Sequence, residues 1–266
     1  MLTRPGSSAL ALAPALVLVV VSLWEVAATW RDTRVVPGDD AWAEAAKVVR
    51  AGYQPGDLIV FAPDWVDPVG RLHLGDLIPV DMAARMDAAT YGRIWELGIR
   101  GARSKDTIGL EAAATTETGG VTVRRFERTP VVVVSDIRDQ KPTSDGAVPT
   151  LELAEVGFEP HRCLQLTPTP GHPTRVTFAQ LPLGTTLVGY VGLADVFTRR
   201  DIRAPGTLAV EIAGKTLATV SPGVDDGWRR FAADTTPGPH HLEVVATAVG
   251  PKARDRRICF AAEARK

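Results

Sequence analysis

The first thirty residues form the most continuously apolar segment of the chain. The apolar run begins at Ala9 and reaches Trp24, and residues 25–30 extend it to the roughly 20 residues that a membrane-spanning helix needs. Residues 1–30 are therefore either a signal anchor or a signal peptide cleaved after the small residues 26–28. A tryptophan so soon after that site, Trp30, is unusual at the start of a mature chain, which favours the anchor. The short polar head favours a body on the periplasmic or extracellular face, with a bacterial inner membrane as the expected location.

Residues 39–130 alternate between helical and strand patterns. Apolar residues recur at helical spacing after Asp39, and Leu58–Phe61 is a short all-apolar run of the kind buried on both faces. The pattern predicts helices over 40–51, 77–88 and 105–114, strands over 58–61, 93–97 and 121–127, and a long loop over 62–75. Such alternation is typical of a small half-Rossmann-like α/β domain with a parallel sheet.

From residue 131 the pattern changes to short strands separated by turns. Residues 131–160 are predicted to form a connecting strand and a polar linker. Eight β-type runs follow within residues 161–266, at 162–166, 175–178, 186–191, 207–212, 216–220, 228–232, 241–246 and 257–260. Their number and spacing predict an all-β domain, a β-sandwich of jelly-roll type.

Charge and cysteine content narrow the classes of function. The net charge of −1 gives no electrostatic case for binding nucleic acid. Arginine outnumbers lysine and asparagine is absent, which is typical of a GC-rich bacterial genome. The two cysteines, Cys163 and Cys259, lie in an early and in the last predicted sandwich strand. In an oxidising compartment they could pair and close a loop of about 100 residues, and two separate buried thiols are the alternative.

Polar chemistry is concentrated after the first predicted strand, where α/β proteins often place their sites. The side chains there are Asp64, Trp65, Asp67, Arg71, His73 and Asp76. Calcium could use several of the carboxylates, and zinc or manganese could use His73 with Asp64 and Asp67. In the structural alternative Arg71 pairs with a carboxylate, Asp76 caps a helix and Trp65 packs the loop down. Apart from this metal no cofactor is predicted.

A basic segment follows the second predicted strand. Arg100, Arg103 and Lys105 precede a predicted helix, and in a parallel sheet they would share an edge with the acidic loop. Cations beside the free amides of a helix start can bind phosphate or carboxylate, including the head group of a lipid-linked sugar. The alternative is internal salt-bridging between the basic segment and the acidic loop.

Both halves contain phrases that resemble known families. The phrases AGYQPGD, LIVFAP, RIWEL and VTVRRFER are similar to the soluble domain of polytopic polyprenyl-phosphate-sugar-dependent glycosyltransferases. Those enzymes carry their catalytic acids between many transmembrane helices, and this chain has at most one, so glycosyl transfer is not implied. The phrases LVGYVGLAD and DGWRRFAADT, with the strand pattern, resemble galactose-binding-like β-sandwiches, which are often non-catalytic binders of glycan or protein.

The sequence therefore favours a non-catalytic protein that is anchored in a membrane and faces away from the cytoplasm. It contains no nucleophile motif and no phosphate-binding loop. The expected partners are a glycan, a lipid-linked sugar or an envelope protein, in a role accessory to cell-surface polysaccharide or glycosylation machinery. Two alternatives are a metal-dependent hydrolase or transferase using Asp64, Asp67 and His73, and a structural subunit of an envelope complex.

Overall fold

The computed structural model describes residues 7–34, 36–169, 171–194, 206–248 and 256–266. They belong to two compact units. The first unit takes in the chain through Tyr53 together with residues 60–73 and 95–126, and the second takes in residues 54–59, 74–94 and 127–266. The predicted polar head at residues 1–6 lies outside the described residues.

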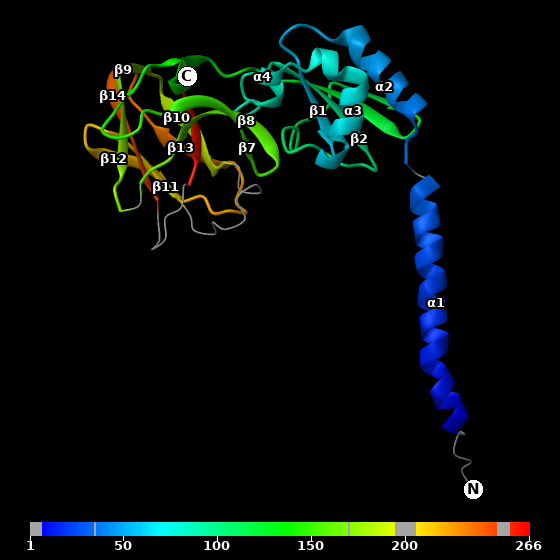
Figure 1. The fold of residues 1–266 in the computed structure, drawn as a ribbon. Coiled ribbons are helices and arrows are strands. Elements are labelled where there is room, and N and C mark those ends of the chain that lie inside the picture. The colour runs from blue at the N-terminus through cyan, green and yellow to red at the C-terminus, as the bar shows by residue number, and fades with distance from the viewer. Residues whose placement is uncertain (1–6, 35, 170, 195–205, 249–255) are drawn as a thin grey trace. The chain divides into compact units, whose positions relative to one another are not determined.

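The apolar segment at the start of the chain forms one continuous helix, α1 (Ser7–Arg34) (Figure 1). Within it, Pro14–Arg31 has a mean hydropathy of 1.4 and is not buried against the rest of the protein. Among the described residues this is one helix long and apolar enough to cross a membrane. A signal sequence near the amino terminus would have the same length and composition.

A four-stranded sheet follows α1 and α2 (Asp39–Gly52). Its order is β1 (Leu58–Ala62), β2 (Arg93–Ile99), β4 (Val121–Glu127) and β3 (Ala114–Thr118). The predicted strands at 58–61, 93–97 and 121–127 are all present. The buried face of α2 consists of Trp42, Ala45, Ala46 and Val49, as the helical spacing predicted.

The predicted half-Rossmann arrangement is not confirmed. Residues 105–113 form turns and irregular structure rather than a helix, and β3 pairs with β4 as an antiparallel hairpin. Gly109 has a φ of +82°, which is incompatible with helical backbone. The Ser104 amide and the Thr107 hydroxyl both donate hydrogen bonds to the Glu96 carboxylate. Local polar chemistry therefore overrides the helical spacing that predicted a crossover helix here.

The predicted loop at 62–75 is largely helical instead. It contains η1 (Asp64–Val66), α3 (Asp67–Leu74) and the start of η2 (Gly75–Leu77). Pro68 lies in the first turn of α3, where its missing N–H would in any case have no helical partner. The helix predicted over 77–88 shrinks to α4 (Val80–Ala83), because Pro79 precedes it and the later carbonyl groups bind other parts of the chain.

The remaining strands form the predicted β-sandwich of two antiparallel sheets. One has the order β13 (Arg229–Asp234), β10 (Thr186–Leu193), β15 (Ile258–Arg265), β8 (Glu159–Leu166) and β7 (Thr150–Val156), with β5 (Val133–Asp136) also on β15. The other has the order β12 (Lys215–Val220), β11 (Gly206–Ile212), β14 (Gly238–Ala248), β9 (Thr174–Leu183) and β6 (Thr143–Ser144).

All eight predicted sandwich strands are present, and most consecutive ones alternate between the two sheets as in a jelly roll. The sequence did not predict β7, because residues 150–156 were expected to belong to the linker. Side chains from both sheets form one core, which includes Leu166, Phe178, Leu187, Val244 and Phe260.

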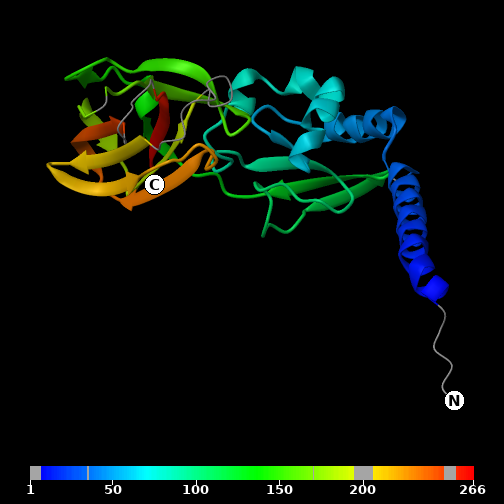
Figure 2. The same ribbon diagram turned by 60° about the horizontal axis from the view of Figure 1, so that its bottom comes forward.

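The last strand, β15, is buried on both faces and lies inside the sandwich (Figures 1 and 2). Ile258, Phe260, Ala262 and Ala264 point into the core. Successive side chains in a strand point to opposite faces of the sheet. The alternate residues Cys259, Ala261, Glu263 and Arg265 therefore face away from this core. Something must therefore cover the outer face of this sheet as well.

Candidate functional site

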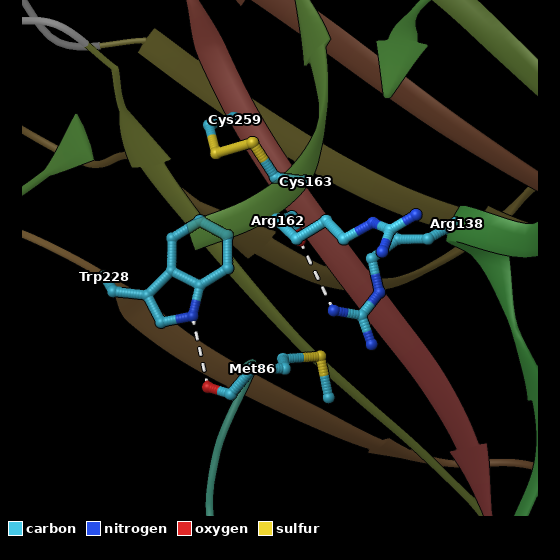
Figure 3. Close-up of a disulfide and its surroundings, with 6 residues drawn as sticks. All are labelled: Met86, Arg138, Arg162, Cys163, Trp228 and Cys259. Carbon is cyan, nitrogen blue, oxygen red and sulfur yellow. Dashed lines mark hydrogen bonds between the residues drawn. A yellow bond between two sulfur atoms is a disulfide. The ribbon is translucent and has the colours of Figure 1, made fainter. Parts of the chain in front are cut away.

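The outer face of β15 is covered by residues 81–91 of the same unit. The Ala84 carbonyl accepts a hydrogen bond from the Arg162 amide over 3.1 Å, and the Met86 carbonyl accepts one from the Trp228 indole over 3.3 Å (Figure 3). The second of these bonds lies beside the disulfide of the sandwich (Figure 3). The covering segment is thus held by its own carbonyl groups, which are not engaged in a helix.

The disulfide joins Cys163 on β8 to Cys259 on β15, which confirms the predicted pairing. The two strands are neighbours, the Cα atoms lie 5.5 Å apart, and both side chains are fully buried. Disulfides persist mainly in oxidising compartments, so the bond agrees with a protein that leaves the cytoplasm.

Five charged side chains form a network beneath the covering segment. Arg265 binds both carboxylate oxygens of Asp87 over 3.0 Å and also binds Glu263 over 2.8 Å. Arg138 binds Glu263 over 3.0 Å and Asp136 over 2.5 Å. Each buried or half-buried charge therefore has a partner of opposite sign, as burial of charge requires.

The network shifts the ionisation of its members in opposite directions. Burial opposes the charged form of Asp87, but the Arg265 guanidinium and the Ala89 amide outweigh it and lower the pKa of Asp87. Burial dominates for Glu263 and raises its pKa despite the same guanidinium. Burial and the nearby Asp87 charge also raise the pKa of Tyr190, whose hydroxyl donates to Asp87, to about 12.

A pocket of about 240 Å³ opens beside this network. Its lining consists of Asp81, Ala84, Arg85, Met86, Asp87, Thr90, Tyr91, Asp136, Arg138, Asp139 and Arg162. It is somewhat smaller than the roughly 300–1,000 Å³ of drug-sized sites, so it suits a ligand of about one ring. Four carboxylates and three guanidinium groups supply acceptors and donors side by side.

Two ion pairs preorganise the rim of the pocket. Arg162 binds Asp81 over 2.7 Å, and Arg138 both binds Asp136 and donates to the Arg162 carbonyl over 3.3 Å (Figure 3). These partners lie on three separate segments of the chain. In each of these ion pairs, the hydroxyl groups of a ligand could replace water that binds the carboxylate and the guanidinium group.

The predicted residues Asp64, Asp67 and His73 lie elsewhere, in the first unit, and Asp76 lies within η2 in the second unit. Asp64 and Trp65 are exposed, Asp67 pairs with Arg71 over 2.5 Å, and the imidazole of His73 lies 3.1 Å from Asp39. The Arg71 pair is one that the structural alternative predicted, whereas Trp65 does not pack the segment down. In the part of the chain that the structure describes, no group of three or more His, Cys, Asp or Glu side chains could hold a metal ion. The metal site therefore stays a prediction to which the geometry adds nothing.

The predicted basic segment is held by a buried carboxylate. Glu96 on β2 is fully buried and accepts from the Ser104 amide over 2.8 Å, from the Thr107 hydroxyl and from Arg124 over 2.9 Å. Arg103 lies 3.1 Å from the same carboxylate. Arg103 is thus engaged internally, while Arg100 and Lys105 are exposed. Phosphate binding by these three cations stays a prediction.

Sequence reasoning missed the pocket because its parts are far apart in the chain. Asp87 and Arg265 are separated by 178 residues. The one local signal was the charged run Asp136-Ile137-Arg138-Asp139, which begins at the last residue of β5, where polar residues end an apolar segment. That run places three of the charged lining residues at the pocket.

No protein-family model and no curated protein matches the chain. Among solved structures, a family 51 carbohydrate-binding module with an INT domain from Clostridium perfringens, in complex with GlcNAc, is 11% identical over 60% of this chain and 41% of its own, with a TM-score of 0.34. A second structure from that organism, an M60 catalytic domain with two such modules, is 10% identical over 60% of this chain and 20% of its own, with a TM-score of 0.38. The chain thus spans less than half the length of either.

A third similar structure is a family 6 carbohydrate-binding module of a Cellvibrio mixtus lichenase in complex with cellotriose. It is 15% identical over 51% of this chain and 98% of its own, with a TM-score of 0.29. TM-scores this low carry no argument about ligand or activity, so the function proposed below rests on the residues of this chain.

Proposed function

We propose that the protein is a membrane-anchored, extracytoplasmic glycan-binding protein without a catalytic role. The observation that carries the proposal is the pocket lined by Arg138 and Arg162, whose carboxylates supply acceptors and whose guanidinium groups supply donors. A sugar hydroxyl both donates and accepts a hydrogen bond, so this lining matches a sugar better than an apolar ligand.

The balance of charge in the pocket favours a neutral sugar. Four carboxylates face three guanidinium groups, so an added phosphate would meet no net positive charge. This makes a neutral glycan a better ligand than the phosphate of a lipid-linked sugar. The half-buried ring of Tyr91 also lines the pocket and offers an apolar face to a sugar ring.

Two further features support the location that we propose. The apolar stretch Pro14–Arg31 is long enough to anchor the chain, and the disulfide fits an oxidising compartment. A role accessory to cell-surface polysaccharide or glycosylation machinery follows from this combination, and co-purification with such enzymes would support it.

The test is binding of neutral mono- and disaccharides to the full chain in nanodiscs, followed by saturation-transfer NMR and calorimetry. Asp139→Asn and Tyr91→Ala alter the pocket, and Asp40→Asn is a matched control because Asp40 is an exposed carboxylate of the first unit. Loss of one hydrogen bond to a charged group should weaken binding by about tenfold or more, whereas the control should bind as the native chain does.

Two results would contradict the proposal. One is the absence of binding by any neutral sugar of the panel. The other is a sugar that binds the native chain and both pocket variants equally, because the ligand would then occupy another surface.

A further inference from the structure

A row of exposed apolar side chains runs along η1 and α3. It consists of Trp65, Val69 and Leu72, which we call the α3 stripe. Their exposed fractions are 63%, 38% and 81%. Asp67 continues the helical backbone from η1 into α3, with φ −51° and ψ −45°. At roughly 3.6 residues per turn the three side chains fall within an arc of about 60°, so they form one continuous surface.

The stripe is separate from the face of α3 that builds the core. Val66 and Leu74 are buried on the other side, and Gly70 lies so close to the Phe61 ring that a Cβ atom would meet it at 1.9 Å. The ion pair between Asp67 and Arg71 occupies a third side. The helix therefore has two apolar faces, and one of them faces away from the core of its own unit.

The chain itself brings this stripe near the end of the apolar helix. Only residues 35–38 separate α1 from α2, and even a fully extended connection of this length spans at most about 17 Å. Asp39, the first residue of α2, lies 3.1 Å from the imidazole of His73. His73 is the residue that follows Leu72 in the sequence. Arg50, in the last turn of α2, donates to the His73 carbonyl over 2.6 Å. The end of the stripe is thus fixed to α2, the helix that a four-residue connection joins to α1.

We propose that the α3 stripe inserts into the interfacial region of the bilayer that α1 spans. The inference rests on the proposed membrane anchoring and adds a second contact with the same lipid. Tryptophan is enriched at this depth because its ring is apolar and its N–H is polar, and aliphatic neighbours add buried area. The exposed charged side chains nearby include the acidic Asp39, Asp40 and Asp64 and the basic Arg50, so the contact depends on apolar burial and does not require anionic lipid.

The test uses nitroxide labels on the full chain in phosphatidylcholine nanodiscs. Leu72→Cys places a label on the stripe, and Val20→Cys places one in the middle of α1. The two native cysteines are buried in the disulfide and do not take the label. Collisions with oxygen report lipid, and collisions with a water-soluble nickel chelate report water. A second Leu72→Cys chain carries Trp65→Ser and Val69→Ser, both at exposed positions that leave the core intact.

We expect the label at 72 to collide several-fold more with oxygen than with nickel, and the serine substitutions to reverse this ratio. If the label at 20 is in lipid while the label at 72 is in water, the inference is wrong and the anchor stands. If the label at 20 is also in water, the anchor itself fails. Dipolar broadening at 72 that disappears when each nanodisc holds one chain would show that a second copy covers the stripe, which would also overturn the inference.

Discussion

Arg265 is the side chain on which the buried charges of the second unit depend. Its guanidinium binds Asp87 through two nitrogens and Glu263 through two more contacts, with an exposed fraction of 7% for the side chain. Burying three charges is costly, and the cost is offset only while every partner is present. The pKa of Asp87 is lowered and that of Glu263 is raised, which shows how closely the cost of burial and the attraction of the guanidinium groups balance.

We expect Arg265→Met to lower the free energy of unfolding by about 3–5 kcal/mol at pH 7, because it leaves Asp87 without its guanidinium partner and Glu263 with Arg138 alone. In the native protein Asp87, whose pKa is lowered, contributes stability above its unfolded pKa that is lost as the pH falls. In the variant burial prevails and raises the pKa of both acids. The difference in the free energy of unfolding between the native chain and the variant should therefore become smaller as the pH falls from 7 to 4.

Urea denaturation at the two pH values checks this expectation. Arg230→Met is the matched control, since Arg230 is exposed on β13, two strands away in the same sheet, and it should change stability by no more than about 0.5 kcal/mol. A deficit of the same size at both pH values would show that Arg265 acts through packing of its stem and not through its charge.

Residue-scale contacts differ in how far the sequence can predict them. The pairing of Cys163 with Cys259 was predictable because only two cysteines exist and both fall in strands. The pairing of Asp87 with Arg265 was not, since 61 charged acids and bases offer many combinations and no local pattern selects one. The burial of Glu96 was equally unpredictable, because two of its partners are a backbone amide and a hydroxyl and no local pattern selects Arg103 and Arg124 among the cations.

At the scale of elements, periodicity predicted strands better than helices. Every strand predicted from alternation or from a short apolar run is present, because such runs have few other ways to be buried. The predicted helix over 77–88 failed because the carbonyls of Ala84 and Met86 bind Arg162 and Trp228, far along the chain. Tertiary hydrogen bonds of this kind override local propensity and leave no signal in the segment itself.

The disulfide between β8 and β15 should contribute to the stability of the sandwich. Replacing Cys163 and Cys259 together by alanine should cost about 2–5 kcal/mol, because a cross-link over 96 residues restricts the unfolded chain strongly. Thermal unfolding of the native chain, with and without reductant, and of the variant measures the loss. If the reduced native chain and the variant both unfold at the temperature of the oxidised chain, the disulfide is not a source of stability.

At the scale of the whole molecule, the change of period near residue 130 correctly predicted a change from mixed α/β elements to a sandwich. The sequence did not predict that residues 74–94 would join the sandwich, or that β3 and β4 would form a hairpin. Both depend on which surfaces remain uncovered after the strands have paired. A single sequence does not encode such surfaces in any short pattern.

The location of the whole chain can be tested through α1. Val19→Arg places a charge in the middle of the apolar stretch and should cost about 2.5–3.5 kcal/mol of insertion, whereas Val19→Leu is a neutral control. After expression in a bacterial host, the native chain and the Leu variant should stay in the membrane fraction after an alkaline wash, and the Arg variant should be depleted there. A native chain recovered in the wash and beginning after residue 28 would show that the segment is a cleaved signal.

The position of β15 in its sheet has a consequence for the order of events during synthesis. This strand comes after all the other strands of its sheet in the sequence, yet it lies between β10 and β8 and also pairs with β5. The six-stranded sheet therefore cannot close until residues 258–265 have left the ribosome, and Cys259 is the later of the two cysteines to emerge. A nascent chain that cannot fold early remains threadable through an export channel, and the loss of residues 258–265 would leave the sheet without its middle strand.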